Sequence, residues 1–119
     1  MINRTNRVRI MHRVVTHGDT VYVGGVTASD TSADMSGQTT EVCQTIEGLL
    51  EEAGSSKEDL LTATIYVVEM QQKDQMTDAW LKWLDQEHLP ARAVIGVAEL
   101  GHPRKLVEIV VTAALSTHS

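Results

Sequence analysis

The chain has 119 residues, the length of one domain, so we treat residues 1–119 as a single unit with a formal net charge of −6. No apolar run is long enough to span a membrane, and the first residues lack the apolar core of a secretion signal, so we expect a soluble, cytoplasmic protein. The acidic balance argues against nucleic acid as a partner, because phosphate binding needs a basic surface.

The first predicted elements are two strands joined by a short turn. Residues 7–15 and 21–27 carry the β-branched residues and the alternation that are typical of strands. The second strand contains Gly24 and Gly25, a pair that fits either a β-bulge or a close approach of the backbone to a ligand. The polar stretch 28–33 that follows is typical of a loop.

A helix is predicted next, beginning at Asp34 or Ser36 and ending near Ala53. Its apolar residues recur at helical spacing, namely Met35, Val42, Ile46, Leu49, Leu50 and Ala53. Gly54 directly after them suits the left-handed conformation that ends many helices. Cys43 is the only cysteine, so an internal disulfide is excluded, and it is predicted to be a small buried or half-buried residue of this helix.

The second half of the chain predicts three strands and one more helix. Residues 60–69 predict a strand and residues 72–87 a helix, followed by two strands over 92–99 and 105–115 that read as a hairpin. The resulting order β-β-α-β-α-β-β predicts a two-layer α/β sandwich, with both helices packed on one face of a mixed sheet.

Alternation assigns the residues of the last two strands to opposite faces of that sheet. The helix-facing residues are then Ala93, Ile95 and Val97 in the first strand and Val107, Ile109, Val111, Ala113 and Leu115 in the second. Arg92, Val94 and Glu108 are predicted to share the opposite face. That face is too apolar to be left in water, so we expect a second copy of the chain to cover it.

Arg92 and Glu108 are the candidate functional residues. An arginine at a strand entrance can hold a carboxylate with two parallel hydrogen bonds. A glutamate among apolar strand residues is expensive to desolvate, so Glu108 needs a partner or a chemical function. Together they predict a pocket that holds a small acid and positions a water against it, although a purely structural ion pair is the alternative. His102 is a weaker candidate for ligand contact, and the five histidines show no metal-ligand spacing.

On these residues the chain resembles the RidA/YjgF family of small homotrimeric enamine/imine deaminases. The resemblance covers nearly the whole chain and is most specific in residues 90–100 (PARAVIGVAEL) and 106–109 (LVEI). It implies a chorismate-mutase-like fold in which three subunits pack their sheets into a central barrel, with clefts between neighbours. It also implies substrates such as 2-aminoacrylate and its imine. A protonated imine carbon is already electrophilic, so no metal or organic cofactor is expected.

The resemblance also implies residue roles. Arg92 would hold the substrate carboxylate, and Glu108 would orient or activate water and assist proton transfer to nitrogen. The residues that would bind the substrate are Arg92, Gly24, Gly25, Val94 and Met11. Three of these positions depart from the best-known deaminase branch, which has Ser in place of Gly24, Tyr in place of Met11 and Cys in place of Val94. The departures enlarge or loosen the pocket and favour a larger or different substrate, or weak activity.

Two further functions stay open. The missing Ser and Tyr favour a non-catalytic regulatory trimer that binds 2-oxo acids. A ribonuclease is suggested for some members of the family, but the acidic charge and the lack of a basic, aromatic stripe count against it. We therefore expect a homotrimer that binds a small carboxylate, without a nucleic-acid or membrane partner.

Overall fold

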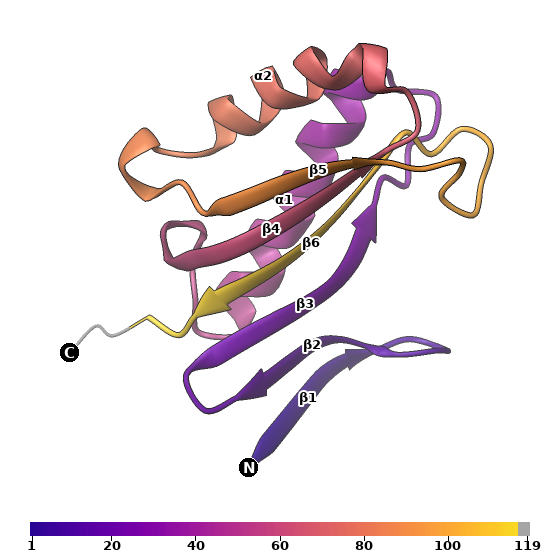
Figure 1. Ribbon diagram of the computed structural model, residues 1–119. Helices are drawn as coiled ribbons and strands as arrows, with labels where there is room; N and C mark the ends of the chain where they lie inside the picture. Colours follow the sequence, from indigo (N-terminus) through magenta and orange to yellow (C-terminus); the bar gives the residue numbers. More distant parts are fainter. Residues whose placement is uncertain (117–119) are drawn as a thin grey trace.

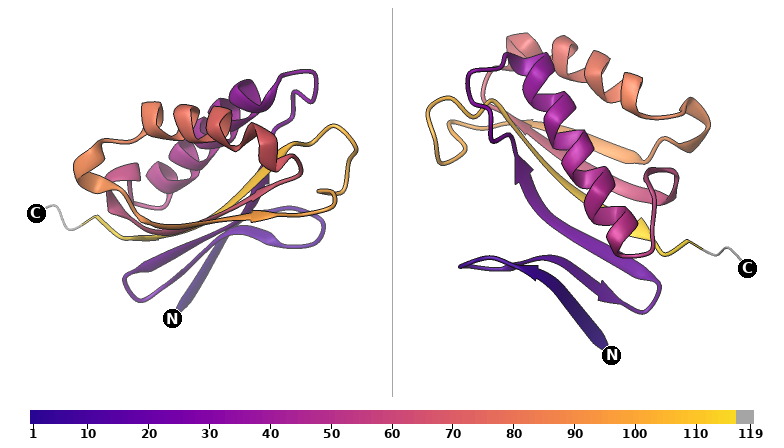
Figure 2. Two further views of the ribbon diagram at one scale, coloured as in Figure 1. Left: turned by 45° about the horizontal axis from the view of Figure 1, so that its top comes forward. Right: turned by 180° about the vertical axis from the view of Figure 1, so that it is seen from behind.

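The computed structural model describes residues 1–116, which form a mixed sheet with helices on one side of it (Figure 1). Within these residues the sheet has six strands in the order β1-β2-β3-β6-β4-β5. The elements are β1 (Ile2–Arg7), β2 (His12–His17), β3 (Thr20–Thr27), α1 (Met35–Glu52), β4 (Leu60–Val67), α2 (Lys73–Trp83), β5 (Ala91–Gly96) and β6 (Val107–Ala114). Both helices cover the same face (Figure 2), so the predicted two-layer α/β sandwich is confirmed.

The N-terminal hairpin differs from the prediction. β1 and β2 are antiparallel, with Arg4 opposite Val15, and the connection is closed by a hydrogen bond that the Val8 N–H donates to the Met11 carbonyl at 2.9 Å. The predicted single strand over 7–15 is therefore wrong, because it spans the turn between two strands. Alternation did not reveal β1, since its residues are mostly polar and all exposed, and Asn6 has a left-handed φ of 57°.

Helix α1 has the predicted ends. The Asp34 carboxylate accepts a hydrogen bond from the Gly37 N–H at 2.8 Å, which is the N-cap interaction. Gly54 has a φ of +87°, the left-handed conformation predicted for it. Cys43 is buried, as predicted. Burial, and secondarily the charge of Glu47, raise the pKa of the Cys43 thiol to about 12.

Strand β6 lies in the middle of the sheet, antiparallel to both β3 and β4. Val107, Ile109, Val111 and Ala113 are at most 1 % exposed, and Leu115 packs against the same core. The predicted helix-facing row of this strand is therefore confirmed. The residues between them, Glu108 among them, point to the face without helices, which we call the open face.

Strand β5 is paired differently from the prediction. It lies parallel to β4 at the end of the sheet, and β4 separates it from β6, so the predicted hairpin is wrong. The parallel register places Arg92 beside Ala63 and Val94 beside Ile65. Ala63 and Ile65 are buried under the helices, so Arg92 and Val94 lie on the helix-covered face. The face assignment predicted for this strand is inverted.

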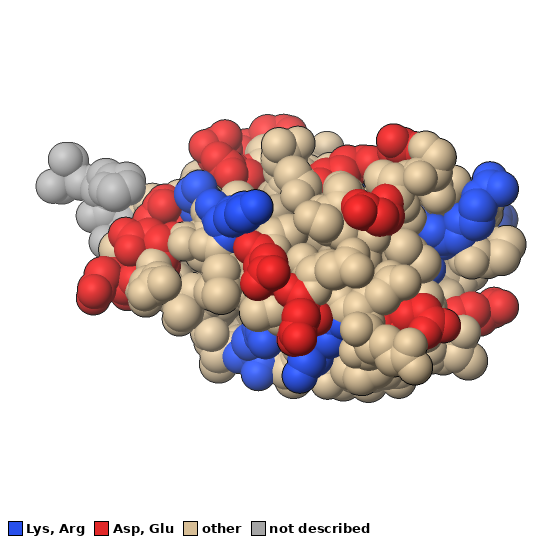
Figure 3. All heavy atoms as spheres, turned by 90° about the horizontal axis from the view of Figure 1, so that it is seen from above, with Lys and Arg blue, Asp and Glu red and all other residues tan. Residues whose placement is uncertain are grey.

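Charged side chains of both signs mix on the surface. The side of the molecule on which α2 lies carries Lys and Arg side chains separated by acidic ones (Figure 3). In the described part of the chain, neither helix combines the length and the apolar character needed to cross a membrane.

Candidate functional site

Glu108 lies on the open face, between Thr27 of β3 and Tyr66 of β4. Its side chain lies across Gly25: a Cβ atom at Gly25 would be only 2.5 Å from Glu108 Oε2. A larger residue at position 25 would therefore displace the carboxylate. The backbone does approach closely here, as the sequence suggested, but what it approaches is the Glu108 side chain.

Gly24 and Gly25 also form a bulge in β3. The pairs Val23–Val111 and Val26–Ile109 enclose two residues on β3 and one on β6, which is the definition of a bulge. The predicted bulge is therefore confirmed, whereas the predicted close approach to a ligand stays a prediction. The bulge brings the backbone of β3 against the Glu108 carboxylate.

Met11 packs on the other glycine of the bulge. Its Sδ atom would lie 3.2 Å from a Cβ atom at Gly24. The two departures from the deaminase pattern at positions 11 and 24 are therefore in contact. The thioether occupies the space that a serine side chain at position 24 would need, and the flexibility of methionine allows it to give way.

A pocket of about 550 Å³ opens beside these residues, and we call it the open-face pocket. Residues that line it include Met11, Arg13, Gly25, Thr27, His102 and Lys105. The Lys105 Nζ donates a hydrogen bond to Thr27 Oγ1 at 2.8 Å, and His102 Nδ1 accepts one from the Arg104 N–H at 3.1 Å. Sequence reasoning placed His102 near a ligand but missed Arg13 and Lys105. A signal for Arg13 existed, since it precedes the buried Val14 and so must point to the open face.

Arg92 lies in a different place. Its side chain lines a hollow of about 280 Å³ together with Pro90 and with Thr77 and Trp80 of α2. The prediction that Arg92 and Glu108 share one face is therefore wrong. Two side chains on opposite faces of one sheet cannot reach each other within the chain. Val94, on the same face as Arg92, is partly buried against the core and is likewise separated from Glu108.

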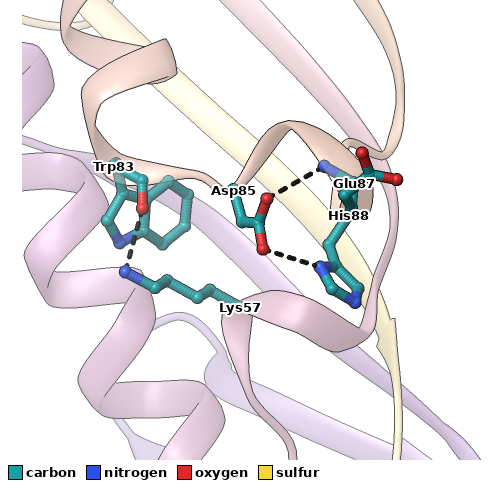
Figure 4. A network of polar contacts seen from close by, with 5 residues as sticks. All are labelled: Lys57, Trp83, Asp85, Glu87 and His88. Atoms are coloured by element: carbon teal, nitrogen blue, oxygen red, sulfur yellow. Dashed lines mark hydrogen bonds and ion pairs between the residues drawn. The ribbon is translucent and has the colours of Figure 1, made fainter.

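The segment that leads to Arg92 is held by polar contacts (Figure 4). Helix α2 ends at Trp83, earlier than predicted, and the Lys57 Nζ donates a hydrogen bond to the Trp83 carbonyl at 2.9 Å. The Asp85 carboxylate accepts a hydrogen bond from the Glu87 N–H at 3.0 Å and lies 3.3 Å from His88 Nδ1. The Glu87 N–H, more than His88, lowers the pKa of Asp85. These contacts order the connection between α2 and β5.

Neither Arg92 nor Glu108 forms an ion pair within residues 1–116. A structural ion pair between the two, the alternative raised by the sequence, is therefore excluded inside one chain. The described residues also contain no cluster of three or more His, Cys, Asp and Glu side chains that could hold a metal ion.

Comparisons with known proteins find similar sequences over most of the chain. A family model described as Endoribonuclease L-PSP matches residues 3–115. A RutC family protein of Haemophilus ducreyi is 33% identical over 116 residues, covering 98% of each chain, and the RutC family protein YoaB of Escherichia coli K12 is 35% identical over 102 residues, covering 86% of this chain and 88% of YoaB.

Solved structures show the same similarity. The crystal structure of NMB1025, a YjgF family member from Neisseria meningitidis, has a TM-score of 0.94 at 26% identity and covers 99% of this chain and 98% of its own. An uncharacterized protein from Pseudomonas aeruginosa has a TM-score of 0.92 at 32% identity, covering 98% of this chain and 100% of its own. The chain therefore belongs to the RidA/YjgF family, as its sequence predicted.

Proposed function

We propose that this protein is a cytoplasmic enamine/imine deaminase that hydrolyses small 2-imino and 2-aminoalkenoic acids to 2-oxo acids and ammonia. The single observation that carries the proposal is the position of Glu108. Its carboxylate lies against Gly25, a residue that lines the open-face pocket, and it has no ion-pair partner among residues 1–116. A half-buried carboxylate in this position is suited to proton transfer rather than to structural pairing.

The proposed site needs two copies of the chain, because Arg92 and Glu108 lie on opposite faces of the sheet. Strand β5, which carries Arg92, is at the end of the sheet and pairs only with β4 in the described residues. Arg92 is therefore exposed at an edge that can reach a neighbour. If each copy places its Arg92 at the Glu108 side of the next copy, such a head-to-tail contact can close into a ring. The family resemblance implies that this ring has three copies, which is the proposed homotrimer.

The chemistry follows from these two groups. Arg92 holds the substrate carboxylate, and a 2-aminoalkenoic acid takes up a proton on carbon to give the imine. Glu108 removes a proton from water while the water oxygen bonds to the electrophilic imine carbon. The proton then passes from Glu108 to nitrogen. As the carbon–nitrogen bond breaks, Glu108 takes the proton of the new hydroxyl group, and a 2-oxo acid and ammonia are released. The imine carbon is electrophilic without further activation, so no cofactor is needed.

The test is the Arg92→Ala variant. We expect kcat/KM for the imine derived from 2-aminoacrylate to fall at least about 100-fold, because the carboxylate loses its charge-assisted hydrogen bonds. Arg92 is exposed in one chain, so the free energy of unfolding should change by less than about 1 kcal/mol. Arg4→Ala, on the exposed strand β1, is the control and should keep the wild-type rate. Wild-type activity in Arg92→Ala would refute the role of Arg92.

A non-catalytic trimer that binds 2-oxo acids is the second candidate, and the packing of Met11 over Gly24 favours it. That packing leaves a thioether where the deaminase branch has a hydroxyl and an aromatic ring. Calorimetry that detects 2-oxo acid binding, together with no ammonia release from a panel of imines, would select this candidate.

RNA cleavage, the activity in the name of the family model, has weaker support. The net charge is −6, and acidic side chains separate the basic ones on the side seen in Figure 3. We expect no degradation of a single-stranded RNA by the purified protein. Cleavage that disappears in Arg92→Ala would revive this function.

A further inference from the structure

Two basic side chains from distant parts of the sequence line the open-face pocket. Arg13 belongs to β2, and its neighbour Val14 is 2% exposed on the helix side, so Arg13 points to the open face. Lys105 belongs to the connection between β5 and β6, and its hydrogen bond to Thr27 Oγ1 at 2.8 Å holds the amine over strand β3. Both side chains are half-buried.

These cations form no ion pair in the part of the chain that the structure describes. Neither Arg13 nor Lys105 forms an ion pair within residues 1–116, and no Asp or Glu is among the residues that line the pocket. His102 lines it too, and since its Nδ1 accepts the Arg104 N–H, its other ring nitrogen carries the proton. The pocket lining therefore carries two half-buried cations and no carboxylate, and an anion bound in the pocket would supply the opposite charge.

Helix α1 fixes two walls of the pocket. The Glu41 carboxylate accepts hydrogen bonds from the Ser29 and Asp30 N–H groups at 2.6 and 3.1 Å. The buried Gln38 side chain donates to the Arg104 carbonyl at 2.9 Å and accepts from the Leu106 N–H at 2.9 Å. The pocket is therefore ordered before a ligand binds, which reduces the entropy cost of binding.

From this arrangement we infer that Arg13 and Lys105 bind a second acidic group of the substrate, so that the preferred substrates are 2-imino dicarboxylic acids. The inference rests on the proposed deaminase function and specifies its substrate class. Gly25 links the two parts of the site, because it both contacts Glu108 and lines the pocket. A substrate as small as 2-aminoacrylate would leave most of the 550 Å³ unfilled, whereas a longer diacid extends from Glu108 toward the two cations.

The reaction keeps its balance with this substrate. Water adds to the imine carbon, the carbon–nitrogen bond breaks, and a 2-oxo dicarboxylate and ammonium are formed from one imine cation and one water. The distal carboxylate takes no part in the chemistry. Arg13 and Lys105 are therefore binding residues that determine which imine is preferred.

The test compares two imines made in situ by amino-acid oxidases, one from glutamate and one from 2-aminobutyrate. For the wild type we expect a higher kcat/KM with the glutamate imine. In the double variant Arg13→Gln/Lys105→Met this preference should fall at least about tenfold, because two charged contacts are lost. The matched control Arg4→Gln/Lys82→Met removes the same charges from exposed positions and should keep the preference. A double variant with the wild-type preference would overturn the inference.

Calorimetry with the products separates this inference from the proposed function. The wild type should bind 2-oxoglutarate more tightly than 2-oxobutyrate, and the double variant should lose the difference. If this holds while no imine is hydrolysed, the second subsite stands and the deaminase proposal fails. If imines are hydrolysed with no preference for the diacid in turnover or binding, the deaminase proposal stands and the subsite fails.

Discussion

The two faces of the sheet differ in how complete they are within one chain. On the helix-covered face, Ile65 and Ile109 are fully buried, and helix α1 adds its own buried residues above them. On the open face, Tyr22 and Ile95 are 46% and 43% exposed, and Glu108 is half-buried without an ion pair in residues 1–116. The helix-covered face is therefore a complete hydrophobic core within one chain, whereas the open face exposes apolar side chains beside charged ones.

This difference separates stability from function. The helix-covered face supplies the apolar burial that folds the chain, because buried area is the main favourable term. The open face carries the bulge, Glu108 and the open-face pocket, and it is the face that a second copy can cover. Substitutions on the two faces should therefore have different signatures.

The largest effect on stability is expected on the helix-covered side of β6. We compare Ile109, which points to the helices, with its neighbour Val110, which points to the open face. Ile109→Ala removes a fully buried side chain and should lower the free energy of unfolding by about 3 kcal/mol. Val110→Ala, on the open face, should cost less than about 1 kcal/mol in a dissociated chain. Urea denaturation measures both values. Because a covered open face links stability to association, the Val110→Ala midpoint should also depend on protein concentration. Equal losses in the two variants would contradict the distinction between the faces.

A second prediction concerns Gln38 of helix α1, which holds the loop that carries Lys105. This buried side chain donates to the Ala33 and Arg104 carbonyls and accepts from the Leu106 N–H. Gln38→Leu leaves these groups without partners, so we expect a loss of about 2 kcal/mol in unfolding free energy. Loosening the loop that carries Lys105 should also weaken 2-oxoglutarate binding. Unchanged stability and binding would show that the loop holds its shape without Gln38.

A third prediction perturbs the open face alone. In Gly25→Ala the new Cβ would lie 2.5 Å from Glu108 Oε2, so the carboxylate must move. We expect kcat to fall about tenfold, since catalysis depends on the position of the base, with a change in stability below about 1 kcal/mol. Gly48→Ala is the matched control, because no atom lies within 4 Å of a Cβ there. It should raise stability by about 0.5–1 kcal/mol and leave kcat unchanged. A normal kcat in Gly25→Ala would exclude Glu108 as the base.

The smallest effect on stability is expected at Cys43, which belongs to the core under the helix-covered face. Its pKa is raised to about 12, so the folded protein keeps the thiol neutral at pH 8 and should react with a thiol reagent far more slowly than the guanidinium-unfolded chain. A raised pKa means that the neutral form is fully stabilising below the unfolded value and that this contribution is lost as pH rises toward 12. Wild type should thus lose stability relative to Cys43→Ala only above about pH 9. Fast labelling at pH 8 would show that the α1 core opens.

The sequence predicted those elements whose local pattern decides the outcome. Asp34, Gly54 and a helical apolar row fix α1, and strict alternation fixes the buried side of β6. The family resemblance also rested on local runs of sequence, and the comparisons confirm it. The two-layer arrangement followed from the order of the elements.

Features that depend on pairing between distant segments were not predictable in the same way. The two rows of β5 are both small or apolar except for Arg92, so alternation alone gave no direction, and only the parallel register with β4 fixes it. Strand β1 is too polar to show an alternation of apolar and polar residues, and it forms because its backbone pairs with that of β2. Arg13 and Lys105 come together only once β2, β3 and the loop before β6 are in place.

Strand β1, at one end of the sheet, limits how copies of the chain can pair strand to strand. All residues of β1 are exposed, Arg4 and Arg7 place positive charge along its edge, and Asn6 interrupts the extended repeat with its left-handed backbone. An incoming strand would have to approach these guanidinium groups, and such edges discourage further pairing. One sheet can continue into the next only if the strands at both of its ends accept a new partner, and within residues 1–116 β5 is the one end strand without such a left-handed residue. The N-terminal hairpin thus protects a protein that must expose part of its sheet from fibrous aggregation.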